Sequence, residues 1–156
     1  MAIVRRAESR DIPAILNLLV QVNMVHHNGR PDLFNGPTTK YTGEELEAIL
    51  ADDATPVFVC TDGDGRVLGH GFCVLQHAGG RLMAEHSTLY IDDICVDENA
   101  RGRHIGKALY EYVRDYAKSI GCNNITLNVW EGNDSAISFY KNMGMQVQKT
   151  TMEIIL

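Results

Sequence analysis

The alternation of apolar and polar residues along the chain predicts four helices. Apolar positions recur every three or four residues in four segments, which are residues 9–27, 42–53, 105–120 and 133–143. The apolar face of the third segment is expected to consist of Ile105, Leu109, Val113, Tyr116 or Ala117, and Ile120. Pro13 fits only in the first turn of the first helix, and Thr42 and Glu45 have the spacing of a capping box. Gly121 and Gly144 follow the last two helices, where glycine commonly ends a helix.

Short apolar runs between turn residues predict strands. Seven segments have this character, which are residues 3–8, 56–62, 66–78, 88–96, 123–130, 145–148 and 150–156. The turn sequence TDGDG at residues 61–65 predicts that the second and third segments form a hairpin. The chain order β-α-α-β-β-β-α-β-α-β-β is not a simple alternation. We therefore expect a mixed α/β (α+β) fold, with helices on the faces of one mixed sheet, in a single domain of residues 1–156.

The composition indicates a soluble globular protein. Apolar residues make up 45 % and charged residues 22 % of the 156 residues, and no apolar run is long enough to cross a bilayer. The start of the chain has no apolar signal core, and the four cysteines lie far apart, which favours reduced thiols in the cytoplasm. The net charge of −6 disfavours nucleic acid and favours cationic small partners. The six histidines lack metal-ligand spacing, so we expect no metal site.

A basic, glycine-containing loop precedes the third predicted helix. Arg101, Arg103 and Lys107 lie with Gly102 and Gly106 directly after an acidic strand end. The first N–H groups of a helix have no partner within it and lie at the positive end of its dipole, so this loop suits a diphosphate. The spacing is neither that of a Walker loop nor that of the dinucleotide-binding glycines. The alternative is an ordinary turn whose charges are solvated.

Two ordered motifs in this region resemble those of the GNAT superfamily of N-acetyltransferases. Residues 101–106, RGRHIG, resemble the signature Q/R-x-x-G-x-G/A, with His104 in place of its first glycine. Residues 133–145, NDSAISFYKNMGM, resemble the motif N-x-x-A-x-x-F-Y-x-x-x-G-F, with Met145 in the final aromatic place. Because the family uses the loop through backbone N–H groups, which histidine retains, we expect the His104 side chain to turn outward.

The resemblance implies a GNAT fold, with a central mixed sheet of six to seven strands, about four flanking helices and a splay between the fourth and fifth strands. It also implies acetyl-CoA as the acyl-donor substrate, bound in that splay. The backbone of Ile94, Cys95 and Val96 would bond the pantetheine as an added strand does, and Asn133 would reach the pantetheine or phosphate region. The diphosphate would lie against a loop made of Arg101, Gly102, Arg103, His104, Ile105, Gly106, Lys107 and Ala108.

Acetyl transfer to an amine needs a proton acceptor and benefits from a proton donor to the departing thiolate. The resemblance implies Tyr140 as the donor, although a tyrosine at that helical spacing also suits a core. Asp92 and Asp93 are the candidate bases, and by its position before the signature Asp92 matches where the resemblance places a base or water-binding residue. Neighbouring strand residues face opposite sides and a bulge would change that parity, so the pattern does not decide between them. Glu85 and His86, just before the strand, are further candidates.

The acceptor site is expected at residues 25–41 and 77–87, the loops that the resemblance associates with acceptor choice. Phe34 and Tyr41 offer apolar walls there, or pin the first loop to the core. The leading hypothesis is an N-acetyltransferase that moves an acetyl group to a primary amine of a cationic small molecule by direct attack on the thioester. The alternatives are a protein N-terminal or lysine acetyltransferase and a non-catalytic acyl-CoA-binding module. The apolar residues of the last strands would also suit a homodimer.

Overall fold

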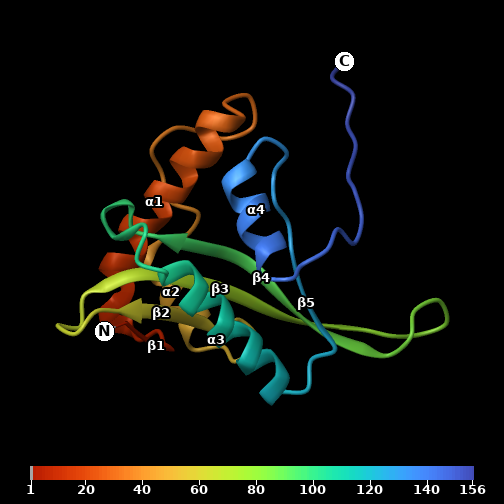
Figure 1. Ribbon diagram of the computed structural model, residues 1–156, viewed down its shortest axis with the longest axis horizontal. Helices are drawn as coiled ribbons and strands as arrows, with labels where there is room; N and C mark the ends of the chain where they lie inside the picture. The colour runs from red at the N-terminus through yellow and green to blue at the C-terminus, as the bar shows by residue number, and fades with distance from the viewer. Residues whose placement is uncertain (1) are drawn as a thin grey trace.

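A computed structural model describes residues 2–156 and contains one five-stranded sheet with four helices (Figure 1). The strands lie in the order β1-β2-β3-β4-β5, and every neighbouring pair is antiparallel except β4 and β5, which are parallel. The mixed sheet and the four helices are confirmed, whereas five strands form instead of six to seven. The elements are β1 (Ile3–Arg6), α1 (Ile12–Gly29), α2 (Gly43–Leu50), β2 (Val57–Thr61), β3 (Val67–Ala78), β4 (His86–Val96), α3 (Ile105–Ser119), β5 (Asn124–Leu127) and α4 (Asp134–Asn142).

The helix ends follow the local signals in the sequence. The Thr42 hydroxyl accepts a hydrogen bond from the Glu45 amide at 3.2 Å, and the Glu45 carboxylate accepts one from the Thr42 amide at 3.0 Å, which confirms the capping box. Gly121 and Gly144 have φ angles of 80° and 97°, a conformation in which a side chain would be strained. These local contacts define where α2, α3 and α4 begin or end.

The two faces of the sheet carry separate apolar cores. One lies under α3, and the other lies under α1 and α2. Leu109 and Val113 of α3 are fully buried as predicted, and the burial of each contributes about 2 kcal/mol to folding. The prediction for Ile120 was wrong, since α3 ends at Ser119 and the Ile120 side chain is 41 % exposed beyond the last turn.

A bulge in β4 decides how the two aspartates face. Phe72 of β3 pairs with Asp93, but the next residue, Cys73, pairs with Ile91, so Asp92 is an extra residue without a partner opposite. The extra residue interrupts the alternation of the strand. Both aspartates therefore lie on the face that α1 and α2 cover, where each contacts side chains of that face.

The parallel pairing of β4 with β5 is short. It runs from Thr88 opposite Asn124 to Ile91 opposite Leu127. From Asp92 onward, the edge of β4 that faces away from β3 has no strand beside it within the described residues. This is the splay that was expected between the fourth and fifth strands.

The chain after α4 departs from the prediction. Residues 145–148 and 150–156 were expected to be strands, but neither pairs with the sheet, and residues 146–156 are exposed throughout. Figure 1 shows this segment leaving the body of the molecule as an extended stretch that ends at the C-terminus. A strand requires a neighbour for its backbone groups, and the described residues give this segment none. Among those residues, no helix combines the length and apolar character that a bilayer span requires.

Candidate functional site

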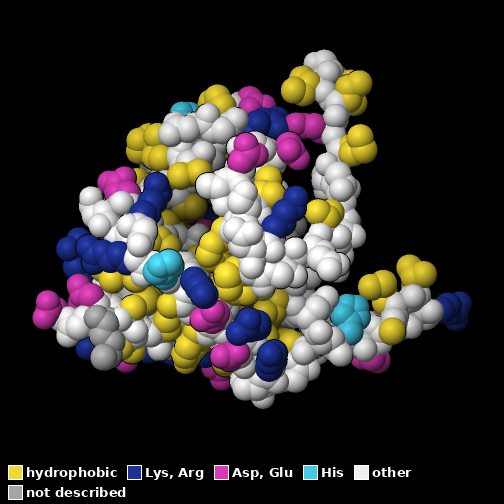
Figure 2. All heavy atoms as spheres, viewed as in Figure 1, with side chains coloured by type: hydrophobic (Ala, Val, Ile, Leu, Met, Phe, Trp, Pro, Cys, Tyr) yellow, Lys and Arg dark blue, Asp and Glu magenta, His cyan; other side chains and the backbone are white. Residues whose placement is uncertain are grey.

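The free edge of β4 forms one side of the candidate site. On its other edge, β4 pairs with β3, with Gly71 opposite Ile94 and Gly69 opposite Val96. In a strand, the backbone groups of successive residues point to opposite edges. The Asp97 N–H donates to Leu68 O of β3, so the groups of Cys95, two residues earlier, also face β3. Ile94 and Val96 therefore present unused N–H and C=O groups to the splay, whereas Cys95, which was expected to do so as well, does not. Figure 2 shows a hollow between α1 and α4 with hydrophobic side chains on its floor.

The loop before α3 forms the second side. Within the described residues, none of the backbone N–H groups of residues 102–107 has a hydrogen-bond acceptor. Arg101 and Arg103 are exposed, and neither forms an ion pair with another described residue. Lys107 has only a long contact of 3.9 Å with Glu111. The loop therefore combines free amides with free positive charge, which is the chemistry that a diphosphate requires.

His104 carries the backbone conformation that a glycine would normally carry. It is the N-cap residue of α3, with φ of 60° and ψ of 25°, and it is the one non-glycine residue with positive φ in the part of the chain that the structure describes. Its side chain is exposed, as expected. The left-handed conformation costs an L-residue about 1 kcal/mol or more, so the position is strained.

The packing around Gly106 would accept a small side chain at this position. A β-carbon at this position would lie 3.6 Å from the Phe139 ring and 3.7 Å from Val96, which are ordinary contact distances. Alanine is also favoured over glycine within a helix by about 1 kcal/mol. Neither packing nor helix stability therefore calls for glycine here, and the position leaves the backbone open to close approach.

Tyr140 of α4 packs partly against the core that lies under α3. Its ring packs against Tyr110 at 6.3 Å and against Phe139 at 5.1 Å between ring centroids. Burial raises the pKa of the Tyr140 phenol, and the negative charge of Asp93 raises this pKa further. The phenol is therefore protonated at neutral pH, and it lies within electrostatic reach of Asp93.

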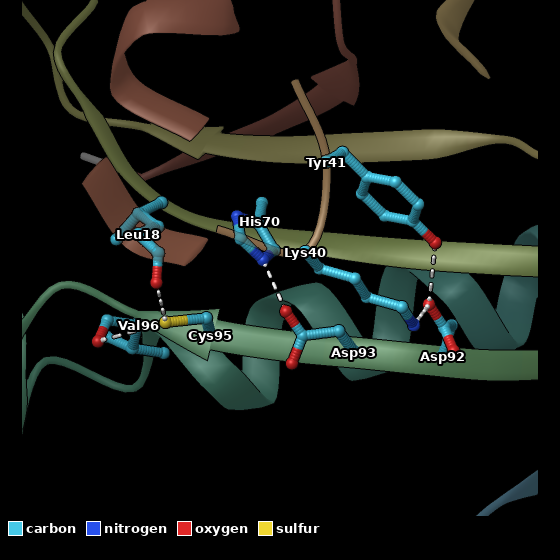
Figure 3. A network of polar contacts seen from close by, with 8 residues as sticks. All are labelled: Leu18, Lys40, Tyr41, His70, Asp92, Asp93, Cys95 and Val96. Carbon is cyan, nitrogen blue, oxygen red and sulfur yellow. Dashed lines mark hydrogen bonds and ion pairs between the residues drawn. The ribbon is translucent and has the colours of Figure 1, made fainter. Parts of the chain in front are cut away.

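Asp93 is paired with a buried histidine. Figure 3 shows the imidazole of His70, on β3, pointing at the Asp93 carboxylate, with 2.7 Å between Nε2 and Oδ2. The His70 side chain has no exposed surface, and its Nδ1 has no hydrogen-bond partner among the described residues. The His70 ring also packs edge-on against Phe72 at 4.9 Å. Asp93 is thus held by a side chain that has no freedom to move away.

Asp92 has a different role. Its Oδ2 accepts a hydrogen bond from Lys40 Nζ at 2.6 Å and a long one from the Tyr41 hydroxyl at 3.4 Å (Figure 3). Burial alone would lower the pKa of Lys40, but the hydrogen bond and charge of Asp92 outweigh it and raise this pKa. The Tyr41 ring stacks on Phe72 at 5.8 Å. Asp92 therefore fastens the loop between α1 and α2 to the sheet.

Nothing in the sequence pattern indicated these roles for His70 or Lys40. His70 pairs with Cys95 and Phe72 with Asp93, so His70 meets Asp93 as a diagonal neighbour on the adjacent strand, a relation that depends on the register between β3 and β4. By contrast, the candidates Glu85 and His86 lie at the far end of the β3–β4 hairpin. His86 pairs there with Ala78, roughly 20 Å along the strand from Asp92.

The loop between α1 and α2 meets the loop between β5 and α4 through aromatic contacts. Phe34 stacks on His26 at 5.0 Å and meets the edge of Trp130 at 5.6 Å. The Arg30 guanidinium lies 6.0 Å above the Trp130 ring. Phe34 therefore joins the two loops through Trp130, a residue that the sequence pattern did not single out.

Comparisons with known proteins agree with this geometry. The sequence model of the Acetyltransferase (GNAT) family matches residues 23–145. The chain is 29 % identical over 123 residues to glucosamine 6-phosphate N-acetyltransferase of Trypanosoma brucei brucei, which covers 74 % of this chain and 78 % of that protein. It is 35 % identical over 106 residues to a peptidyl-lysine N-acetyltransferase of Salmonella typhimurium, covering 66 % of this chain and 60 % of the relative.

A solved structure extends the comparison to nearly the whole chain. The crystal structure of a mutant of the BH1408 protein from Bacillus halodurans superposes with a TM-score of 0.94, at 31 % identity, over 99 % of both chains. The family match covers the loop before α3, both aspartates and Tyr140. This protein is therefore an acetyltransferase, and its chain belongs to the GNAT family.

Proposed function

We propose that this protein transfers an acetyl group from acetyl-CoA to a primary amine of a cationic small molecule. One observation carries the proposal above all. His70 holds the Asp93 carboxylate at 2.7 Å on the part of β4 that has a free edge. Burial and the charge of Asp93 keep the pKa of Tyr140 raised, and the amides at the start of α3 are free. The thioester would supply an activated carbonyl carbon, while the protein binds, orients and moves protons.

The acyl donor would bind at the free edge of β4 and at the loop before α3. The amides of residues 102–107 and the side chains of Arg101, Arg103 and Lys107 bind the diphosphate. Ile94 and Val96 bind the pantetheine through main-chain hydrogen bonds, as a sheet binds an added strand, while Cys95 between them faces β3. Asn133 caps α4 with its side-chain oxygen, which accepts from the Ala136 amide at 3.4 Å. Its amide group remains to donate to the pantetheine or phosphate region.

Each proton that moves in the proposed reaction has a donor and an acceptor. An amine with a pKa of ~10.4 is mostly protonated at pH 7, so one proton leaves to solvent before reaction. Asp93 accepts the second proton as the amine nitrogen forms its bond to the thioester carbon. Tyr140 donates its phenolic proton to the sulfur as the carbon–sulfur bond breaks, and Asp93 then returns its proton to Tyr140 through solvent. His70 holds Asp93 in position throughout.

Charge favours a cationic acceptor. The chain carries a net charge of −6, and Asp93 presents a carboxylate whose partner, His70, is not a permanent cation. Asp92 is neutralised by Lys40 and shapes the acceptor loop instead. Three of the four free thiols are buried, which suits a reducing compartment, and we place the protein in the cytoplasm.

A protein acceptor is the second candidate, because the Salmonella relative is named for acetylation of peptidyl-lysine. A non-catalytic acyl-CoA-binding module is disfavoured, since binding alone requires neither Tyr140 nor the pair of Asp93 with His70.

A thiol-release assay with a panel of acceptors tests these readings. The panel contains a polyamine, an amino sugar and its 6-phosphate, an amino-acid amide, and peptides with a free N-terminus or a lysine. We expect CoA release with at least one cationic small amine. Release with peptides alone supports the protein acceptor. Calorimetric binding of acetyl-CoA without release from any acceptor supports the module, and the absence of binding contradicts the donor site itself.

A further inference from the structure

Lys40 brings a primary amine of the chain itself to the candidate bases. It belongs to the loop between α1 and α2, and its Nζ lies 2.6 Å from Oδ2 of Asp92 and 5.4 Å from the centre of the Tyr41 ring. Asp93, to which the proposed function assigns the base, is the next residue of β4. Figure 3 shows the Lys40 side chain extended so that its ammonium group reaches the Asp92 carboxylate.

Exposure does not distinguish Lys40 from the rest of the lysines, but location does. The other exposed lysines of the chain are Lys107, Lys118, Lys141 and Lys149. Within the described residues, the only ion pair that any of these four forms is the long contact of Lys107 with Glu111. The Lys40 side chain is 54 % exposed, and its four-carbon stem is flexible. Its amine can therefore move over a short range while it stays near Asp92.

The donor site of the proposed function places the thioester beside this amine. With its diphosphate at the loop before α3, acetyl-CoA extends back along the free edge of β4 past Val96 and Ile94. Strand β5 occupies that edge as far as Ile91, so the thioester end has to stop between Ile94 and Ile91. Asp92 lies in this stretch, roughly 7 Å along the strand from Ile94. The Lys40 amine thus lies where an acceptor amine would meet the thioester.

We propose that Lys40 is a self-acetylation site, at which the protein moves the acetyl group of its own bound acetyl-CoA to Nζ and so releases the loop between α1 and α2 from the sheet. The proposal rests on the proposed function, because it uses the same donor and the same base. Asp92 raises the pKa of Lys40, so the neutral amine is rare and the reaction is slow. A free acceptor therefore competes well, and self-acetylation proceeds mainly when acetyl-CoA is present without an acceptor.

The self-acetylation step balances without a further reactant. The Lys40 ammonium group loses one proton to solvent, and its nitrogen then forms a bond to the thioester carbon while Asp93 accepts a second proton. The carbon–sulfur bond breaks with its electron pair on sulfur, which takes the phenolic proton of Tyr140. Asp93 returns its proton to Tyr140 through solvent. The products are an acetamide at Lys40, the thiol of CoA and one proton in solvent.

Acetylation removes the charge that fastens the loop. A neutral acetamide cannot form the ion pair with Asp92, which is the one ion pair between this loop and β4 in the described part of the chain. The loop keeps the stacking of Tyr41 on Phe72 and the hydrogen bond from the Asn23 amide group to Gly36 O at 2.8 Å. The modified loop should therefore stay attached but open more often.

Mass spectrometry of the full-length protein, incubated with acetyl-CoA alone, tests the site. We expect one acetyl group per chain, mapped to Lys40 and added about tenfold or more faster than at any other lysine, because only Lys40 is held at the thioester. The rate should not change when the protein is diluted, and a saturating acceptor amine should lower it. Lys40→Arg should abolish the modification while it keeps a positive charge for Asp92. Lys118→Arg, in the last turn of α3, is the matched control and should still be acetylated at Lys40.

A variant of the base separates catalysed from chemical acetylation. Asp93→Asn should slow the acetylation of Lys40 by about 10²-fold and leave the slow reaction of the other lysines unchanged. In the acetylated wild-type protein, the amides of the loop between α1 and α2 should exchange about tenfold faster with solvent than before modification. Equal acetylation of all lysines overturns the proposal. A rate at Lys40 that Asp93→Asn does not change, or an unaltered exchange of the loop, also overturns it.

The outcomes for this proposal and for the proposed function are distinguishable. Turnover of a free amine without acetylation of Lys40 overturns self-acetylation while the proposed function stands. Acetylation of Lys40 by a protein that accepts no free amine supports self-acetylation and contradicts the small-molecule acceptor. The absence of acetyl-CoA binding contradicts both.

Discussion

The Nε2 atom of His70 lies 2.7 Å from Oδ2 of Asp93, and the histidine that makes this contact is completely buried. The contact joins β3 to the bulge of β4. It distinguishes the two adjacent aspartates, because Asp92 is bound by Lys40 of the neighbouring loop. The two adjacent aspartates therefore have different partners, and the proposed function assigns the base to Asp93 and the anchoring of the loop between α1 and α2 to Asp92.

The two aspartates should differ in kinetics. Asp93→Asn should lower kcat by about 10²-fold or more, which is the usual effect of losing a general base. Asp92→Asn removes the ion pair with Lys40 and loosens the acceptor loop, so it should mainly raise KM for the amine. Steady-state kinetics with a saturating donor measure both. A larger loss of kcat in the Asp92 variant would reverse the assignment.

We expect His70 to act by positioning Asp93. His70→Gln should lower kcat less than Asp93→Asn does, because glutamine can still donate a hydrogen bond to the carboxylate. The two substitutions together should cost little more than Asp93→Asn alone. Additive losses in the double variant, with normal thermal stability, would reduce the histidine to a packing role.

Tyr140→Phe should lower kcat by about 10²-fold while the Kd for acetyl-CoA changes less than twofold. The phenol donates a proton late in the reaction, whereas its ring, which phenylalanine keeps, maintains the contacts with Tyr110 and Phe139. Tyr112→Phe, on the outer side of α3, is the matched control and should have wild-type kinetics. Stopped assays of thiol release and calorimetry give the two quantities, and equal kcat values for both variants would remove Tyr140 from the mechanism.

Gly106→Ala should separate stability from binding. The added methyl group meets Phe139 and Val96 only at ordinary contact distances, so the melting temperature should be unchanged or slightly higher. The same methyl group lies where the diphosphate approaches the backbone, so the Kd for CoA should rise about tenfold, or about 1.4 kcal/mol. Calorimetry measures the affinity, and unaltered affinity would show that the diphosphate binds elsewhere.

His104→Gly should stabilise the fold. Glycine adopts the φ of 60° without the clash that costs an L-residue about 1 kcal/mol. Glycine also raises the conformational entropy of the unfolded chain, which offsets most of this gain in stability. We therefore expect a small rise in the free energy of unfolding, measured in urea. His104→Ala is the control, since it keeps a β-carbon in the strained conformation and should show no such gain.

Asp11 should make stability depend on pH. Burial disfavours its ionised form, but hydrogen bonds from Arg5 at 2.8 and 2.9 Å and from the Glu8 amide at 2.8 Å outweigh burial and lower its pKa below 3.8. A lowered pKa in the folded state stabilises the protein above the unfolded pKa, and this contribution is lost as the pH falls through the folded value. Asp11→Asn should therefore cost about 2 kcal/mol at pH 7 and progressively less below about pH 4. Urea titrations of both proteins at pH 7 and pH 3 compare these differences.

The sequence by itself determined the local structure and the family. Thr42 with Glu45, and the glycines after α3 and α4, act through contacts within one turn, so spacing along the chain is enough to read them. Periodicity likewise predicted the buried face of α3 at Leu109 and Val113. The two motifs that carry the family resemblance are also contiguous, which is why residues 101–106 and 133–145 identified it.

The tertiary structure alone decided how distant residues meet. The bulge at Asp92 depends on the register between β3 and β4, and this register brings His70 to Asp93 and Lys40 to Asp92. The extended, unpaired course of residues 146–156 likewise could not be read from their strand-like sequence. Propensity gives a segment the capacity to be a strand, but only a neighbouring edge makes it one, because backbone hydrogen bonds in a sheet join residues that are far apart in the chain.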